Sequence, residues 1–100
     1  MSINQVIVSG VLERDPDLRF DEESRKARVR LDVRCERPVK DRNGKWIRTT
    51  EIIPVYMVGT EAERVAGWNR QGGHVEIVGK LRPCGKGCIV VALHVESVKK

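Results

Sequence analysis

Residues 28–58 read RVRLDVRCERPVKDRNGKWIRTTEIIPVYMV and carry the clearest strand pattern in the chain. From position 29 to position 35, apolar residues alternate strictly with charged ones. This period of two is typical of a strand with one face in the core and one face outside. A polar segment runs from Cys35 to Lys45, and a second strand-like run begins at Trp46. The stretch therefore predicts one long β-hairpin with a basic front.

The loop of this hairpin carries a strong turn signal and much of the positive charge. Asn43-Gly44 is a dipeptide in which both residues tolerate the positive φ of tight turns. Residues 28–48 hold eight cations against three anions, and residues 80–100 hold five against one. The net charge of +5 therefore conceals a more positive face, which is what a polyanion would meet. The ordinary alternative is that these side chains solvate an exposed hairpin and protect its edge.

Length and hydropathy bound the class of protein. A chain of 100 residues predicts a single domain over residues 1–100 with one modest core. The first residues lack the charged start of a signal peptide, and no apolar run approaches the roughly 20 residues that span a bilayer. We therefore expect a cytoplasmic protein without a membrane segment.

The cysteines argue against a disulfide framework, because their number, three, is odd. Cys84 and Cys88 invite comparison with a zinc site, in which His74 and His94 would be further ligands. Structural zinc commonly uses Cys-x2-Cys knuckles, whereas three residues separate Cys84 from Cys88. Small buried or turn-flanking thiols are the better interpretation of all three, Cys35 included. We expect no metal and no cofactor.

The sequence shows no arrangement that is typical of an enzyme. The acidic residues between positions 15 and 23 fall in turns, without a paired base or nucleophile. Gly72-Gly73 and Gly85-Lys86-Gly87 lack the Lys-Ser/Thr continuation of a phosphate-binding loop. The pattern favours a binding protein without catalytic residues.

Outside the hairpin, the sequence predicts a barrel strand and one helix. Residues 6–12 are apolar almost throughout, and Gly10 indicates a bend or a close approach of two backbones. A capping-box pattern begins at Thr60 and predicts a helix over residues 61–71. We expect Trp68 to pack this helix onto the sheet.

Three more runs complete the predicted sheet. Residues 18–20 form a short strand-like run, and residues 74–82 and 89–98 form two longer ones after the helix. The residues of the first long run expected to face inward are Val75, Ile77, Gly79 and Leu81. Without the short run at residues 18–20, the order strand, strand, strand, helix, strand, strand predicts an all-β fold, a five-stranded oligonucleotide-binding (OB-fold) barrel with one short helix between strands 3 and 4.

Several segments are informative when they are taken together and in order. The chain opens with INQVIVSGVLERDPDLRF at residues 3–20, enters an apolar strand at Thr50-Glu51, and carries RQGGHV and VGKLR at residues 70–75 and 78–82. Their order and spacing resemble the bacterial-type single-stranded DNA-binding protein family over nearly the whole chain. The resemblance implies a homodimer or homotetramer that binds single-stranded DNA without sequence preference, in DNA replication, recombination or repair. It also implies replication or primosome proteins as further partners.

The sequence departs from this family in its aromatic residues and at its end. Members usually stack bases on aromatic side chains, but Trp46 and Tyr56 are the aromatics that remain near the basic hairpin. The positions that align with the others hold Pro38 or Val39, Ile52, Val58 and the region of Lys86. The sequence stops at Lys100, where the family usually continues into an acidic tip, and in this it resembles the tail-less primosomal replication protein N.

We predict that single-stranded DNA crosses the front of the hairpin, its loop and the last two strands, where cations contact phosphates and aromatic rings stack on bases. The predicted contact residues are Arg28, Arg30, Arg34, Arg37, Lys40, Arg42, Lys45, Trp46, Arg48, Tyr56, Lys80, Arg82 and Lys86. One alternative is an oligomeric adaptor of a primosome or replication-restart complex, in which protein interaction is the main role. Another is RNA, because such a barrel contacts exposed bases in either nucleic acid.

Overall fold

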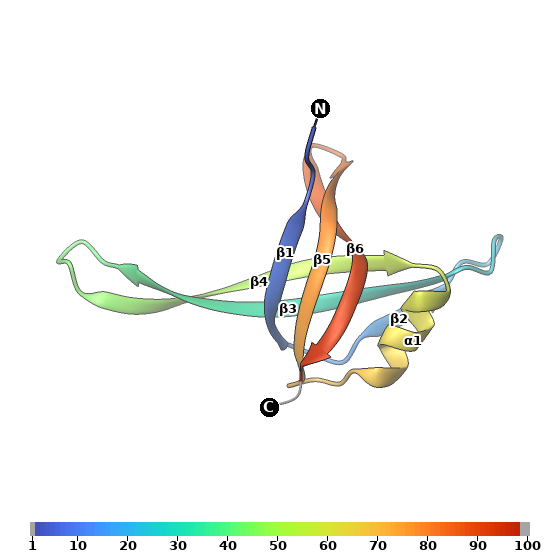
Figure 1. Cartoon of the computed structure of the whole chain (residues 1–100), viewed down its shortest axis with the longest axis horizontal. Coiled ribbons are helices and arrows are strands. Elements are labelled where there is room, and N and C mark those ends of the chain that lie inside the picture. Colours follow the sequence, from blue (N-terminus) through green and yellow to red (C-terminus); the bar gives the residue numbers. More distant parts are fainter. Residues whose placement is uncertain (1, 99–100) are drawn as a thin grey trace.

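A computed structural model describes residues 2–98 of the chain as six strands and one helix. The elements are β1 (Val6–Leu12), β2 (Asp17–Phe20), β3 (Ala27–Lys40), β4 (Trp46–Val58), α1 (Thr60–Trp68), β5 (His74–Cys84) and β6 (Gly87–Val98). The order β1-β5-β6-β4-β3 closes into a barrel, because β3 also pairs with β1 (Figure 1). β4 and β6 run parallel, and the other neighbours run antiparallel. The predicted OB-fold barrel is confirmed, with α1 between its third and fourth strands and the short β2 added at the edge of β3.

β3 and β4 form the predicted long hairpin, paired in register from Arg28 opposite Val58 to Lys40 opposite Trp46. Among the described residues, the strand residues of its outer half, 36–50, pair only with one another. This half projects from the barrel as a two-stranded arm along which the ribbons cross (Figure 1). The expected polar excursion at the start of the loop is wrong, because β3 continues through it as a strand. Backbone hydrogen bonds between the two strands hold this segment together, so it needs no apolar core. Its polar side chains are tolerated because both faces of a free hairpin are open to water.

An aspartate organises the turn of this hairpin. The carboxylate of Asp41 accepts hydrogen bonds from the backbone N–H of Asn43 at 2.9 Å and of Lys45 at 2.8 Å. Gly44 has φ 77°, but Asn43 does not have positive φ. The expectation that both residues of the dipeptide serve a tight turn is therefore only half right, because Asp41 closes a longer loop over residues 41–45.

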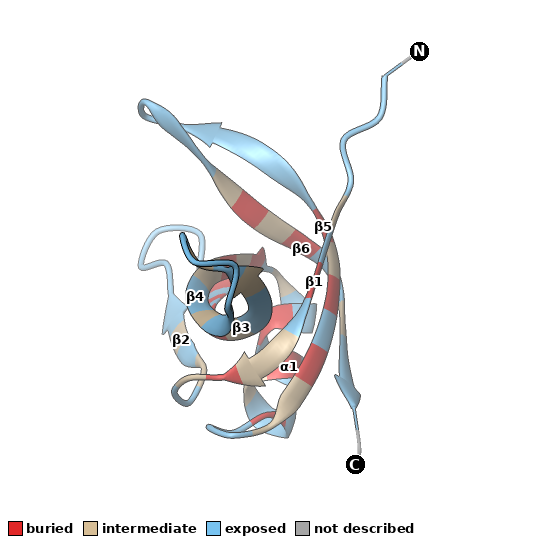
Figure 2. Ribbon diagram, turned by 90° about the vertical axis from the view of Figure 1, so that its left-hand side faces the viewer, coloured by how far each residue is buried: buried red, intermediate tan, exposed pale blue. Residues whose placement is uncertain are grey.

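The core lies inside the barrel and against α1, where the inward faces of the strands meet (Figure 2). The largest fully buried side chains are Leu12, Val29, Leu31, Val33, Val55, Val75 and Ile77. Burial of each such side chain contributes about 1.5–3 kcal/mol. The alternation read from residues 29–35 is thus confirmed for the valines and the leucine, which point into the core.

The barrel closes where β1 and β3 approach each other most closely. A Cβ atom on Gly10 would lie 2.3 Å from the backbone oxygen of Arg34. No side chain fits at that separation, so the predicted close approach at Gly10 is confirmed. A Cβ atom on Gly79 would lie equally close to the backbone oxygen of Val91, beside a bulge in the β5–β6 pairing.

The helix differs from its prediction at both ends. Gly59 is its N-cap and no side chain caps it, so the capping box at Thr60 is wrong. It ends at Trp68, because Asn69 turns into an extended conformation and its side-chain amide donates to the carbonyl of Val65 at 2.7 Å. The expected packing of Trp68 is also wrong, since 79% of it is exposed. The buried stripe passes through Val65 and Asn69, and Trp68 lies about 100° around the helix from Asn69. At nine residues, this one helix of residues 2–98 is too short to cross a bilayer.

The pairing of β5 with β1 ends at Gly79, and the β5–β6 hairpin ends in a two-residue turn between Cys84 and Gly87. Leu81 lies opposite the buried Val90 and so shares its inward side, as expected, but 44% of it is exposed and it is not part of the core. The side-chain amide of Asn4 donates to the carbonyl of Leu81 at 2.8 Å and accepts from its N–H at 2.9 Å. These bonds occupy backbone groups that the edge of β5 would otherwise leave unpaired.

The three cysteines lie in two different environments. Cys35 is partly buried, and its thiol donates to the carbonyl of Ser9 at 3.4 Å. Burial, with a smaller effect from the charge of Glu51, raises the pKa of Cys35. Cys84 and Cys88 are exposed beside the β5–β6 turn. Within residues 2–98, no group of three or more His, Cys, Asp and Glu side chains is placed to hold a metal ion.

Candidate functional site

The strand registers align one row of residues across the outside of the barrel. Asp17 lies opposite Arg30, Arg30 opposite Tyr56, Tyr56 beside Val91, and Val91 opposite Lys80. Directly paired residues point to the same side of a sheet, so this row belongs to one surface that spans five strands. Residues two positions along a strand share that side. We call this surface the outer face, and its members used below are Arg28, Arg30, Tyr56, Val58, Lys80 and Arg82.

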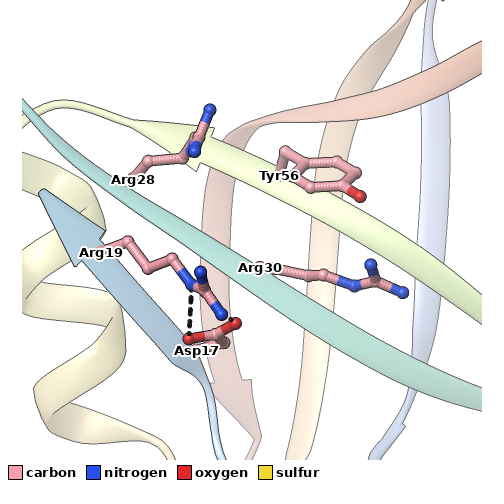
Figure 3. A pocket seen from close by; sticks show the side chains of 5 residues that line it. All are labelled: Asp17, Arg19, Arg28, Arg30 and Tyr56. Atoms are coloured by element: carbon pink, nitrogen blue, oxygen red, sulfur yellow. Dashed lines mark hydrogen bonds and ion pairs between the residues drawn. The ribbon is translucent and has the colours of Figure 1, made fainter. Parts of the chain in front are cut away.

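The centre of the outer face is a shallow hollow of about 320 Å³. It is lined by Asp17, Arg19, Arg28, Arg30 and Tyr56. Figure 3 shows side chains from β2, β3 and β4 in this hollow, with Arg19 bonded to Asp17 and the other three groups beside one another. An aromatic ring next to guanidinium groups is the combination that holds a base and its phosphate.

Arg30 is fixed within this hollow on two sides. Its Cζ atom lies 5.8 Å from the centre of the Tyr56 ring, within the range of a cation–π interaction. Its Nε–H donates to the carboxylate of Asp32 at 3.0 Å. This hydrogen bond, together with the charge of Asp32, raises the pKa of Arg30, so the guanidinium stays protonated.

A second hollow, of about 500 Å³, continues the outer face toward the β5–β6 hairpin. Val58 and Leu93 form part of its apolar lining, and Lys80 and Arg82 supply its cations. Because Val58 lies opposite Arg28, which lines the first hollow, the two hollows adjoin. The structure therefore brings cations from β3 and from β5 onto one continuous surface.

The tip of the arm carries a separate group of predicted residues. The ammonium of Lys40 lies 5.2 Å from the centre of the Trp46 ring, and 63% of Trp46 is exposed. Arg42 and Lys45 lie in the adjacent turn. The tip thus offers a flat ring beside several cations, at a distance from the barrel (Figure 1).

Other predicted cations are engaged by acidic residues. Arg34 bonds Glu13 at 3.2 Å, and the Glu36 carboxylate lies 3.5 Å from Arg48. Arg37 bonds Glu51 at 3.1 Å and lies on the side of the arm opposite to Arg34 by alternation. Within residues 2–98, the predicted cations that form no ion pair are Arg28, Lys40, Arg42, Lys45, Lys80, Arg82 and Lys86.

The sequence reasoning missed the contribution of β2. Arg19 lies opposite Arg28 because β2 and β3 form a hairpin whose turn is closed by Asp21. The carboxylate of Asp21 accepts from the N–H groups of Glu23 and Ser24, and these bonds lower the pKa of Asp21. The acidic turn that begins at Asp21 was the signal in the sequence for this hairpin. If the strands on either side of that turn are paired, Arg19 lies beside the basic strand.

Comparison with known proteins points to one family. The model of the single-strand binding protein family matches residues 3–84. The chain is 31% identical over 80 residues to a single-stranded DNA-binding protein of Fusobacterium nucleatum subsp. nucleatum, covering 80% of this chain and 51% of that protein. It is 32% identical over 82 residues to one of Neisseria meningitidis serogroup A, covering 82% of this chain and 47% of that protein. The chain therefore spans about half the length of these curated relatives.

Solved structures show the same barrel. The fold is similar to a deletion mutant of the single-stranded DNA binding protein from Thermus aquaticus, with a TM-score of 0.84 and 22% identity over 97% of this chain and 51% of that one. The wild-type protein from the same organism gives a TM-score of 0.82 with 21% identity, over 97% of this chain and 50% of that one. At these identities the likeness establishes the fold alone.

Proposed function

The chain belongs to the single-strand binding protein family, and from this premise we propose that it binds single-stranded DNA without sequence preference. The strand would cross the outer face of the barrel and reach the tip of the arm. The proposed setting is DNA replication, recombination or repair in the cytoplasm, with replication or primosome proteins as further partners.

One observation supports this proposal above the others: Arg28, Arg30 and Tyr56 line a single hollow that adjoins the one with Lys80 and Arg82. Cations spaced along a groove can neutralise successive phosphates, whatever the base sequence. Stacking on a ring is also tolerant of sequence, because every base has a flat face, and each stacked base contributes about 1–3 kcal/mol. Tyr56 on the barrel and Trp46 at the tip are the rings that would serve.

A titration with oligo-dT tests the proposal. Each neutralised phosphate of a single strand lowers the slope of log K against log salt by about 0.7, so we expect a slope of about −3 to −5 if most of the unpaired cations take part. The signal would be the tryptophan fluorescence, measured between about 50 and about 200 mM salt. Trp46→Phe and Trp68→Phe variants assign the change in emission to one ring, which we expect to be Trp46. Binding that does not respond to salt, or no binding, would contradict the proposal.

A homo-oligomer is the second part of the proposal. Ile7 points outward from β1 with 71% of it exposed. β1 pairs with β3 through Val11 and Leu12 alone among the described residues, so the preceding part of that edge has no strand beside it. A second copy could cover both features. Sedimentation equilibrium should give the mass of two or four chains, and a mass of one chain at micromolar concentration would contradict it.

An oligomeric adaptor with protein contacts as its main role is the rival. The ion pairs of Arg34, Arg37 and Arg48 with acidic residues favour it, because these cations are already engaged. If the protein is an adaptor, reversing Arg28 and Arg30 to glutamate should leave its oligomeric state and its protein contacts unchanged. If it is a DNA-binding protein, the same change should abolish its binding of single-stranded DNA. That pair of substitutions therefore separates the two functions.

A further inference from the structure

A buried acid lies in the middle of the outer face. Asp32 is 6% exposed, and it is the only charged residue of residues 2–98 that is buried. It points to the same side of β3 as Arg30, two positions away. A negative charge on a surface that meets a polyanion weakens binding unless it has another role. The contacts of Asp32 indicate what that role is.

Both carboxylate oxygens of Asp32 are occupied by arginines. Oδ1 accepts from Nε of Arg30 at 3.0 Å, and Oδ2 lies 3.2 Å from Nε of Arg14. The Arg14 side chain is 68% exposed and the Arg30 side chain 48%, so the arginines face the solvent while the acid lies beneath them. Asp32 therefore holds two cations at the surface instead of presenting its own charge to a ligand.

We propose that Asp32 is a positioning residue for single-stranded DNA, because it fixes the guanidinium of Arg30 beside the ring of Tyr56, so that the two planar groups form one stacking surface for a base. The inference rests on the proposed function and deepens it. Arg30 is bonded through Nε alone, so its two terminal nitrogens are free of Asp32 and can contact the phosphate next to that base. This arrangement lets a surface with few aromatic rings hold a base with one ring and one arginine.

Asp17 offers a matched control, because it lies opposite Arg30 on the same face but bonds Arg19. Simple electrostatics predicts that neutralising either acid strengthens binding to a polyanion. If Asp32 positions Arg30, the two substitutions should change the affinity in opposite directions. Asp32→Asn should weaken binding of oligo-dT by about tenfold, as expected for one weakened stacking contact, while Asp17→Asn should tighten it, because it removes a negative charge that holds no part of the proposed stacking surface.

The test compares four proteins in the same titration: the unsubstituted chain, Asp32→Asn, Asp17→Asn and Arg30→Lys. Arg30→Lys keeps the charge and the buried acid but removes the planar group, so it should weaken binding about as much as Asp32→Asn without changing the salt slope. In an Arg30→Ala background, Asp32→Asn should no longer weaken binding, whereas a merely structural role would weaken it with or without Arg30. The NMR signal of the Arg30 Nε–H should persist in Asp17→Asn and broaden in Asp32→Asn.

The outcomes distinguish this inference from the proposed function. If the unsubstituted chain fails to bind oligo-dT, the proposed function and the positioning role of Asp32 are both wrong. If it binds and Asp32→Asn binds equally or more tightly, the positioning role alone is wrong. If Asp32→Asn fails to fold, Arg30→Lys decides: unchanged affinity overturns the inference, and a loss of about tenfold at constant salt slope supports it.

Discussion

Reversing Arg28 and Arg30 together to glutamate should reduce the affinity for oligo-dT by at least about a hundredfold. Both side chains line the central hollow of the outer face, and Arg28 forms no ion pair within residues 2–98. A hydrogen bond to a charged group contributes about 1.5–3 kcal/mol, so losing two exceeds the roughly 2.7 kcal/mol that a hundredfold change requires. Repulsion of the phosphates by the new carboxylates adds to this loss.

The control for that reversal is a second pair with the same change in net charge. Arg64 lies in α1 and Arg70 follows it, both outside the outer face, and Arg64 pairs with Glu61. Reversing these two should weaken binding only through the general charge of the chain. Equal losses from the two double variants, with both proteins folded by circular dichroism, would show that binding follows net charge and does not use the outer face.

Substituting Gly10 by alanine should reduce the free energy of unfolding by about 3 kcal/mol, the upper range for atoms forced into a packed site. The added Cβ would lie 2.3 Å from the backbone oxygen of Arg34, and a backbone atom cannot move aside as a flexible side chain can. β1 and β3 would have to separate where the barrel closes. Such a loss is a large share of the roughly 5–15 kcal/mol that stabilises a typical domain. Urea unfolding followed by circular dichroism measures it.

Gly67 provides the matched control for this substitution. It lies inside α1, and apart from its chain neighbours and the backbone of its own helix, a Cβ at that position would meet nothing within 4 Å. Gly67→Ala should therefore raise the free energy of unfolding by about 0.5–1 kcal/mol, because alanine restricts the unfolded chain and favours the helix. If Gly10→Ala proved as stable as the unsubstituted chain, the close approach of β1 to β3 would be wrong.

The sequence was sufficient to predict the barrel because its signals are local. The strict alternation around Leu31 and the single short helix before residues 74–82 are patterns within one segment, and they define the strands and their order. The same local reasoning did not predict the exposure of Leu81. Its alternation with Ile77 is real, but β1 pairs with β5 only as far as Gly79, so the inward side of β5 beyond that residue stays partly exposed.

The composition of the site depended on contacts that no local pattern reveals. Arg34 meets Glu13, which is 21 positions away, and this pair follows from the way β1 returns to β3. Asp32 reads as one more outward residue of an alternating strand, and its burial becomes apparent only when Arg14 is placed over it. Sequence reasoning found the cations and the rings, but it could not tell the paired cations from the free ones.

Ultraviolet cross-linking to oligo-dT, with the attached peptides identified by mass spectrometry, would show directly which surface single-stranded DNA contacts. Trp68 is 79% exposed and Trp46 63%, so accessibility alone would favour Trp68, which lies on α1 away from the outer face. We expect cross-links at Tyr56 and Trp46 and none at Trp68. Cross-links at Trp68 without any at Tyr56 would show that single-stranded DNA binds another surface of this protein.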